Sequence, residues 1–219
     1  MRRYFIQNQH NKSRRNYIER VNNSKLKCIK VAKKYDFDYW DGDRKFGYGG
    51  YKYIKDYWKS FAKKLIKNYK LNNKSKIVDL GCGKGYLLFE IKKLLPDIKI
   101  LGIDNSNYAI KNSKEEIKKF LLRRNLKNRL PYKNDYFDLA ISLATFHNFD
   151  LQTLEIAINE MSRISKSQYL MVESFSNEKQ RFNLQCWALT AETLISIKDW
   201  VWLFKNFNFK GDYEFIFFN

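Results

Sequence analysis

Three glycines at alternate positions follow a short apolar segment near residue 80. Residues 78–86 read VDLGCGKGY, between a segment that favours a strand and one that favours a helix. Glycine accepts positive φ and lets a ligand approach the backbone, and the N-terminus of a helix offers free N–H groups. Tyr86 stands where a dinucleotide fingerprint requires glycine, and the absence of Gly-Lys-Ser/Thr excludes a P-loop. Asp79, two residues before the first glycine, is unfavourable beside a pyrophosphate and suits a cationic ligand.

A second acidic residue ends the next apolar segment. Asp104 closes the sequence LGID at 101–104, about 20 residues beyond the glycine loop. An acid at the end of the second strand of a nucleotide-binding unit can bind both ribose hydroxyls. Together, Asp79 and Asp104 predict a ligand that has a ribose, carries positive charge and has no phosphates.

Strand and helix patterns alternate from residue 77 onward. Apolar segments predict strands at 77–80, 98–103, 120–123, 136–143, 169–172 and 213–218. Helical spacing predicts helices at 54–69, 87–95, 106–118 and 151–164, and a further helix that Ser196 opens with Asp199 as its capping-box acid, after an irregular stretch. This alternation predicts an α/β fold with a mostly parallel sheet and helices on both faces.

The N-terminal quarter of the sequence differs from the rest. Residues 1–35 are polar and basic, and predict one or two amphipathic helices or a partly ordered arm; the block from Arg2 to Lys34 has only Glu19 as a counter-charge, which is typical of a solvated arm. The aromatic and glycine residues that follow predict a loop with specific contacts. We therefore expect a basic extension and lid over 1–53, and one domain over 54–219.

Residues 55–175 resemble the class I S-adenosylmethionine-dependent methyltransferases, through the glycine loop, Asp104 and the segment 137–147. The resemblance implies a Rossmann-like sheet of order 3-2-1-4-5 plus the C-terminal strand, and S-adenosylmethionine as cofactor. It places the methionine part of the cofactor on the glycine loop, the ribose on Asp104 and the adenine amino group on Asn125, which replaces the usual acid. The implied cofactor-binding residues are Asp79, Gly81, Cys82, Gly83, Gly85, Asp104, Asn105, Asn125, Leu126 and Leu143.

Residues at the ends of the fourth and fifth predicted strands are candidates for catalysis. His147 follows the fourth strand and could take a proton near neutral pH, and Glu173 ends the fifth and could hold a substrate hydroxyl or amine. The alternatives are a structural histidine and a salt-bridged glutamate. Tyr48 and Tyr51 flank two glycines and predict a lid over the acceptor; the alternative is a turn packed on the sheet edge.

The composition limits the classes of acceptor. The net charge of +19 would suit nucleic acid, but lysine and asparagine fill polar positions throughout the 219 residues, as an AT-rich gene dictates. Segments at 39–43, 48–51, 183–187 and 211–213 resemble a bacterial subgroup associated with polysaccharide gene clusters. We therefore expect a small-molecule acceptor such as a sugar or sugar derivative. The alternatives are an RNA methyltransferase and a non-catalytic cofactor-binding scaffold.

Several absences narrow the prediction further. The sequence has no long apolar run and no signal-peptide pattern, and its three cysteines are scattered, so we expect a cytoplasmic protein without disulfides or membrane contact. No acidic cluster ends the fourth strand, so no catalytic metal is expected. Neither Asn-Pro-Pro-Tyr/Phe nor Pro-Cys follows that strand, which disfavours DNA amino-methylation and cytosine C5-methylation.

Overall fold

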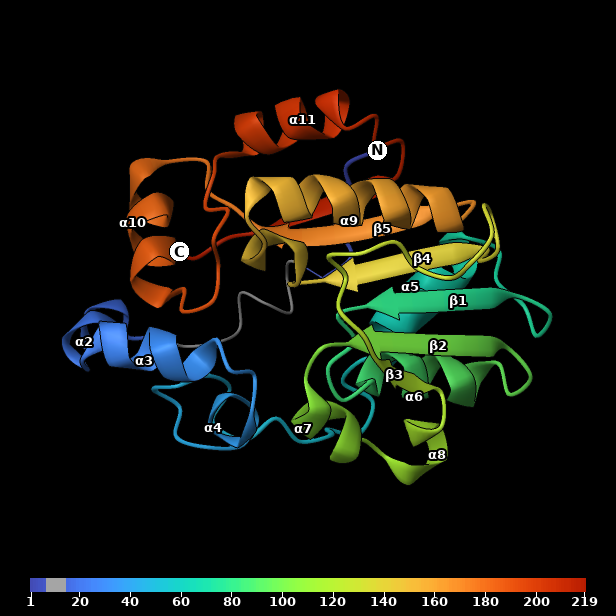
Figure 1. The fold of residues 1–219 in the computed structure, drawn as a ribbon, viewed down its shortest axis with the longest axis horizontal. Coiled ribbons are helices and arrows are strands. Elements are labelled where there is room, and N and C mark those ends of the chain that lie inside the picture. Colours follow the sequence, from blue (N-terminus) through green and yellow to red (C-terminus); the bar gives the residue numbers. More distant parts are fainter. Residues whose placement is uncertain (7–14) are drawn as a thin grey trace.

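The computed structural model describes residues 1–6 and 15–219. In these residues, six parallel strands form one sheet of order β3-β2-β1-β4-β5-β6 (Figure 1). The strands are β1 (Lys76–Leu80), β2 (Lys99–Asp104), β3 (Leu121–Arg123), β4 (Leu139–Leu143), β5 (Gln168–Glu173) and β6 (Asp212–Ile216). The predicted Rossmann-like fold and strand order are confirmed, and the C-terminal strand is parallel to β5.

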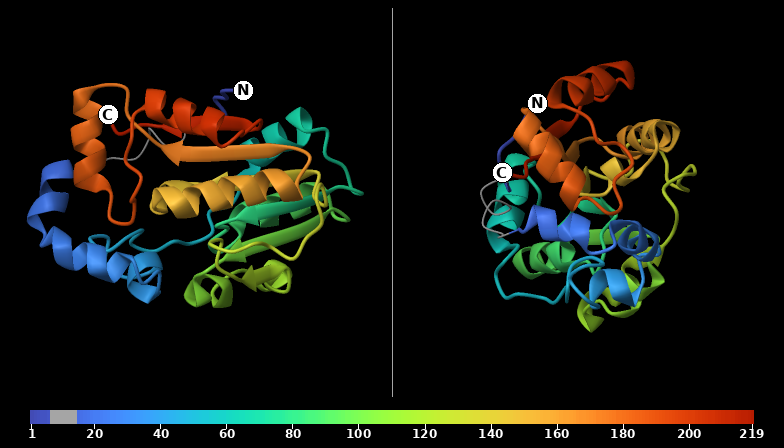
Figure 2. Two further views of the ribbon diagram at one scale, coloured as in Figure 1. Left: turned by 45° about the horizontal axis from the view of Figure 1, so that its top comes forward. Right: turned by 90° about the vertical axis from the view of Figure 1, so that its left-hand side faces the viewer.

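Helices cover both faces of this sheet. They are α5 (Lys59–Asn68), α6 (Tyr86–Leu94), α7 (Asn107–Lys111), α8 (Glu115–Lys118), α9 (Leu151–Ile164) and α11 (Ile197–Asn206), whereas α10 (Glu178–Trp187) lies beyond the ends of the strands. Leu154 of α9 and Trp200 of α11 belong to a core on one face, and Phe61 of α5 and Leu88 of α6 to a core on the other (Figures 1 and 2). Burial of each such side chain contributes about 1.5–3 kcal/mol, so the apolar stripes of these helices hold them on the sheet.

Three elements differ from the prediction, and the first is a short helix at Phe37–Trp40 within the segment expected to be a loop. The helix expected over 106–118 is two short helices, α7 and α8; Ser113 between them donates its hydroxyl hydrogen to the Ile110 carbonyl at 2.7 Å, which competes with helix continuation. The stretch expected to be irregular contains α10. Buried Asn183, which donates to the Phe218 carbonyl at 3.1 Å, interrupts the apolar face that would have indicated this helix.

The N-terminal residues pair with the last strand. The backbone N–H groups of Phe5 and Ile6 donate to the buried Glu214 carboxylate at 2.6 and 2.9 Å. The prediction of a solvated arm is therefore wrong for residues 1–6. The part of that prediction over 7–14 lies outside the described residues.

Three short helices follow: α2 (Tyr17–Asn22), α3 (Lys25–Ala32) and α4 (Phe37–Trp40). The first two confirm the helices predicted within 1–35. Together with α10, they lie beyond the carboxyl ends of the strands, where the arrowheads of β1, β2 and β4 point (Figures 1 and 2). Over the described ranges, no helix combines the length and the apolar character required to cross a bilayer.

Candidate active site

The glycine loop has a backbone conformation that is unfavourable for residues with a Cβ atom. Gly81 and Gly83 have φ of +86° and +55°. A Cβ atom at Gly81 would lie 2.0 Å from Thr145 Oγ1, and one at Gly83 would lie 2.7 Å from the Trp40 ring. Gly85 serves as the N-cap of α6. The loop thus needs glycine both for its conformation and for its close contact with neighbouring segments.

Asp104 connects this loop to the end of β2. Its Oδ2 accepts a hydrogen bond from the Gly83 backbone N–H at 2.8 Å, and its Oδ1 accepts one from Ser106 at 2.8 Å. A cavity of about 320 Å³ adjoins the carboxylate. Its lining includes six of the predicted cofactor-binding residues: Gly81, Asp104, Asn105, Asn125, Leu126 and Leu143. The structure therefore brings together the residues that were expected to bind the adenosine.

A second, larger cavity of about 540 Å³ lies against the glycine loop, and Asp79, Gly81, Cys82 and Gly83 line it. The Asp79 side chain is buried, with the residue only 4% exposed, and its Oδ1 has no hydrogen-bond partner in the part of the chain that the structure describes. Burial, together with the nearby charge of Asp104, raises the pKa of Asp79 to about 8. A cationic ligand group would satisfy this oxygen, so the residues present fit the ammonium group of S-adenosylmethionine.

The predicted lid residues also line the larger cavity. The Tyr48 ring stacks on Trp40 with centroids 5.3 Å apart, and the Tyr51 ring stacks on Tyr86 at 5.3 Å. Tyr48 and Gly81 line both cavities, so the two spaces adjoin. The segment before α5 thus forms an aromatic wall at the boundary between them.

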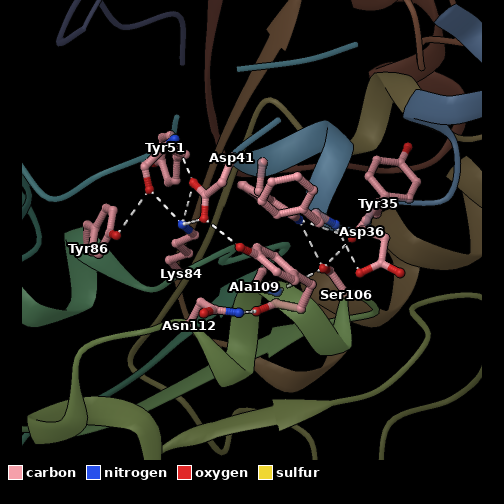
Figure 3. A network of polar contacts seen from close by, with 12 residues as sticks. Tyr35, Asp36, Asp41, Tyr51, Lys84, Tyr86, Ser106, Ala109 and Asn112 are labelled. Atoms are coloured by element: carbon pink, nitrogen blue, oxygen red, sulfur yellow. Dashed lines mark hydrogen bonds and ion pairs between the residues drawn. The ribbon is translucent and has the colours of Figure 1, made fainter. Parts of the chain in front are cut away.

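An ion pair between buried Lys84 and partly buried Asp41, which the predicted site does not include, holds this wall to the glycine loop (Figure 3). Lys84 Nζ donates to both carboxylate oxygens of Asp41, at 2.7 and 2.8 Å, and to the Tyr51 carbonyl at 2.8 Å. The Tyr108 hydroxyl donates to Asp41 at 2.8 Å. Lys84 inside the glycine loop and Asp41 among the aromatic residues are both visible in the sequence. Their pairing was not predicted because the two residues are 43 positions apart.

Trp40 makes a second attachment between the aromatic wall and the residues predicted to bind the cofactor. Its indole Nε1–H donates to Ser106 Oγ at 2.9 Å, and Ser106 in turn donates to the Tyr35 carbonyl (Figure 3). Ser106 is also the N-cap of α7 and donates its backbone N–H to Asp104. The position of the aromatic wall is therefore coupled to the carboxylate expected to bind the ribose.

His147 and Glu173 lie side by side at the ends of β4 and β5. The Glu173 backbone N–H donates to His147 Nδ1 at 3.2 Å, and His147 Nε2 is 3.5 Å from Glu173 Oε2. Because Nδ1 accepts, the hydrogen of the neutral ring is on Nε2 and faces the carboxyl group. Burial lowers the pKa of His147 to about 3 and raises the pKa of Glu173 to about 7. Glu173 lines the larger cavity, whereas His147 lines neither of the two.

Comparison with known proteins places this geometry in a family. Residues 71–208 match the model of a methyltransferase domain. The chain is 29% identical to carboxy-S-adenosyl-L-methionine synthase of Nautilia profundicola over 128 residues, which are 54% of this chain and 52% of that protein. It is 35% identical to ribosomal RNA small subunit methyltransferase C of Buchnera aphidicola over 100 residues, 42% of this chain and 28% of that protein. The chain thus spans between about a quarter and about half of these relatives.

Solved structures support the fold. A chain in the complex between the Haloferax volcanii Trm112 methyltransferase activator and a methyltransferase is 18% identical, with a TM-score of 0.50, over 71% of this chain and 77% of that one. A methyltransferase of Bacillus halodurans is 15% identical, also with a TM-score of 0.50, over 67% and 68%. The family match covers more than half of the sequence, and the solved structures share its fold. This chain belongs to the class I S-adenosylmethionine-dependent methyltransferase family.

Proposed function

We propose that this chain transfers the methyl group of S-adenosylmethionine to a small molecule bound in the larger cavity. One observation carries the proposal: Asp79 of the glycine loop, Glu173 at the end of β5 and the lid residues Tyr48 and Tyr51 line the same cavity. That cavity adjoins the one lined by Asp104. The donor and the acceptor can therefore occupy neighbouring spaces beyond the carboxyl ends of the strands, where ligands of open α/β sheets bind.

The chain offers a partner for each end of the donor. Asp104 would accept hydrogen bonds from the ribose hydroxyls, Asn125 from the adenine amino group, and Asp79 from the ammonium group. When bound, the donor supplies an electrophilic methyl group on a sulfonium. The remaining work of the protein is to orient the acceptor for in-line attack and to remove its proton.

Glu173 is the base in this proposal. Its pKa of about 7 lets the carboxylate take a proton from an acceptor hydroxyl or amine near neutral pH. His147 acts through Glu173, because its Nε2–H lies 3.5 Å from Oε2 and its Nδ1 accepts from the backbone of the same residue. The proton passes from the acceptor to Glu173 while the acceptor oxygen or nitrogen bonds to the methyl carbon.

The aromatic lid limits competing hydrolysis. Trp40, Tyr48 and Tyr51 form an apolar wall, and Lys84 and Ser106 tie its backbone and its indole to the donor side. A closed wall excludes water, which would otherwise compete with the acceptor for the methyl group. A cavity of about 540 Å³ suits a small metabolite, and a sugar or sugar derivative remains our candidate.

Transfer of labelled methyl groups tests the proposal. The full-length chain is incubated with labelled donor and either a small-metabolite extract or total RNA, and Glu173→Gln serves as the inactive control. We expect label in a small molecule with the wild-type chain alone. Label in RNA only would refute the small acceptor, and donor binding by calorimetry without any transfer would refute the enzymatic function.

A further inference from the structure

Three arginines surround one tryptophan on the outer wall of the larger cavity. The guanidinium carbons of Arg20, Arg44 and Arg15 lie 4.4, 4.9 and 5.6 Å from the centroid of the Trp187 ring. All four residues line the cavity, and we call this group the arginine wall. Arg20 belongs to α2 and Trp187 to α10, two helices that contact each other beyond the sheet (Figure 2).

Two of the three arginines, Arg20 and Arg44, are held by backbone carbonyls and not by acidic side chains. Within the described part of the chain, neither Arg20 nor Arg44 forms an ion pair with a carboxylate. Arg20 Nη1 instead donates to the backbone carbonyls of Arg44 and Lys45, at 2.7 and 2.9 Å, and Arg44 donates to the carbonyl of Gly47. Burial and, to a smaller extent, the neighbouring Arg44 charge lower the pKa of Arg20 to about 10.

Among the described residues, neither acid that lines the cavity forms an ion pair with Arg20 or Arg44. Among the described lining residues, the acids are Asp79 and Glu173, and burial raises the pKa of both. Arg15 acts electrostatically on Glu173, so the arginine wall and the base face a common space. A buried, crowded cluster of cations is costly unless an anion compensates it.

We propose that the arginine wall binds an anionic group, a carboxylate or a phosphate, on the methyl acceptor. This rests on the proposed function, because it requires the acceptor to occupy the larger cavity. Guanidinium groups held in place by carbonyls and by an aromatic face present preorganised donors that match the oxygens of either anion. A neutral sugar would leave Arg20 and Arg44 without a counter-charge among the described residues, so the acceptor is an acidic or phosphorylated metabolite.

Calorimetry with simple anions tests this without knowledge of the acceptor. The full-length chain, saturated with S-adenosylhomocysteine, is titrated with inorganic phosphate and separately with succinate, at constant ionic strength. We expect one saturable site for at least one anion, and the anion that binds identifies the group on the acceptor. Arg44→Gln should weaken this binding about 10- to 100-fold, the range for a hydrogen bond between charged groups. Arg181→Gln on α10, which lies outside the cavity lining and pairs with Glu178, should leave it unchanged.

Two outcomes would overturn the inference: no saturable binding of either anion, or equal losses in Arg44→Gln and Arg181→Gln. Tight binding of a short RNA that displaces phosphate and depends on Arg44 would also overturn it, in favour of a nucleic acid. Thermal unfolding shows whether Arg44→Gln folds; if it does not, Arg44→Lys keeps the charge, loses the planar fork, and should bind phosphate more weakly than wild type. Two separate titrations distinguish failure of this inference from failure of the proposed function. Titration with S-adenosylhomocysteine alone tests the donor site, and titration of the anions into the unliganded chain tests the arginine wall.

Discussion

Replacement of Asp79 by asparagine removes the buried charge that we assign to the ammonium group of the donor. The residue is only 4% exposed, and its pKa is about 8 because of burial and the nearby Asp104. In the unliganded protein, the ionised fraction of this carboxyl is therefore about 1% at pH 6 and about 9% at pH 7. The donor's amino group, with an ordinary pKa of about 7.7–8.0, is largely protonated over the same interval.

Donor binding should then release a proton, because a bound cation favours the ionised carboxylate. The association constant of S-adenosylmethionine should rise about tenfold from pH 6 to pH 7, which corresponds to about 1.4 kcal/mol. Calorimetry at both pH values measures this rise. Repetition in two buffers with different ionisation enthalpies counts the protons released.

The variant Asp79→Asn should bind the donor more weakly at pH 7 and show neither the tenfold rise nor the proton release. Glu173→Gln is the matched control: the pKa of Glu173, about 7, also lies near this interval, but its removal should leave the effect of pH on donor binding in place. A tenfold rise that persists in Asp79→Asn, or a flat profile in the wild-type chain, refutes our assignment. In the unliganded chain, the raised pKa of Asp79 means that its contribution to stability is lost as pH rises toward 8, so Asp79→Asn should flatten that decline in thermal unfolding.

Three further substitutions test other parts of the site. Glu173→Gln should lower kcat about 10²- to 10⁴-fold in single-turnover transfer with unchanged donor affinity, and an unchanged kcat would exclude Glu173 as the base. Gly81→Ala should abolish donor binding in calorimetry, since its Cβ would lie 2.0 Å from Thr145 Oγ1; wild-type affinity would contradict the assigned loop geometry. Lys84→Met leaves Asp41 unpaired and should lower the free energy of unfolding in urea by about 3 kcal/mol, with partial recovery in the double variant that adds Asp41→Asn. A loss below about 0.5 kcal/mol would show that the ion pair does not hold the lid.

The parts of the fold that local patterns encode could be predicted from the sequence. The apolar segment of β1 is buried on both faces of a parallel sheet, so it appears in the sequence as a continuous run. The capping box of Ser196 and Asp199 is formed as predicted. The glycine loop could also be predicted from a short stretch of sequence, because its positive φ angles require glycine.

Features that depend on distant partners could not be predicted in this way. The helical pattern of α10 is interrupted by Asn183, whose amide donates to the distant carbonyl of Phe218. The pairing of Lys84 with Asp41 joins two segments whose separate patterns contain no sign of it. The arginine wall likewise requires α2 and α10 to meet.

The different positions of the two predicted catalytic residues relative to the cavity also depend on contacts between distant parts of the chain. Both His147 and Glu173 were placed at the ends of strands, which topology determines. Which of the two lines the cavity depends on side-chain burial, and burial also moves their pKa values in opposite directions. The positions of His147 and Glu173 in the sequence do not show which of the two side chains is buried away from the cavity.

The pairing of Phe5 with Glu214 crosses 209 positions of the sequence and has a consequence for the order of assembly. The donor-binding loop, β2 and Asp104 lie within a short stretch of chain, so their contacts can form early. Residues 1–6 cannot make this contact until β6 has been synthesised, and α2 cannot meet α10 until α10 has been synthesised. On a ribosome or during refolding, we therefore expect the chain to acquire affinity for the donor before it acquires a closed chamber for the acceptor.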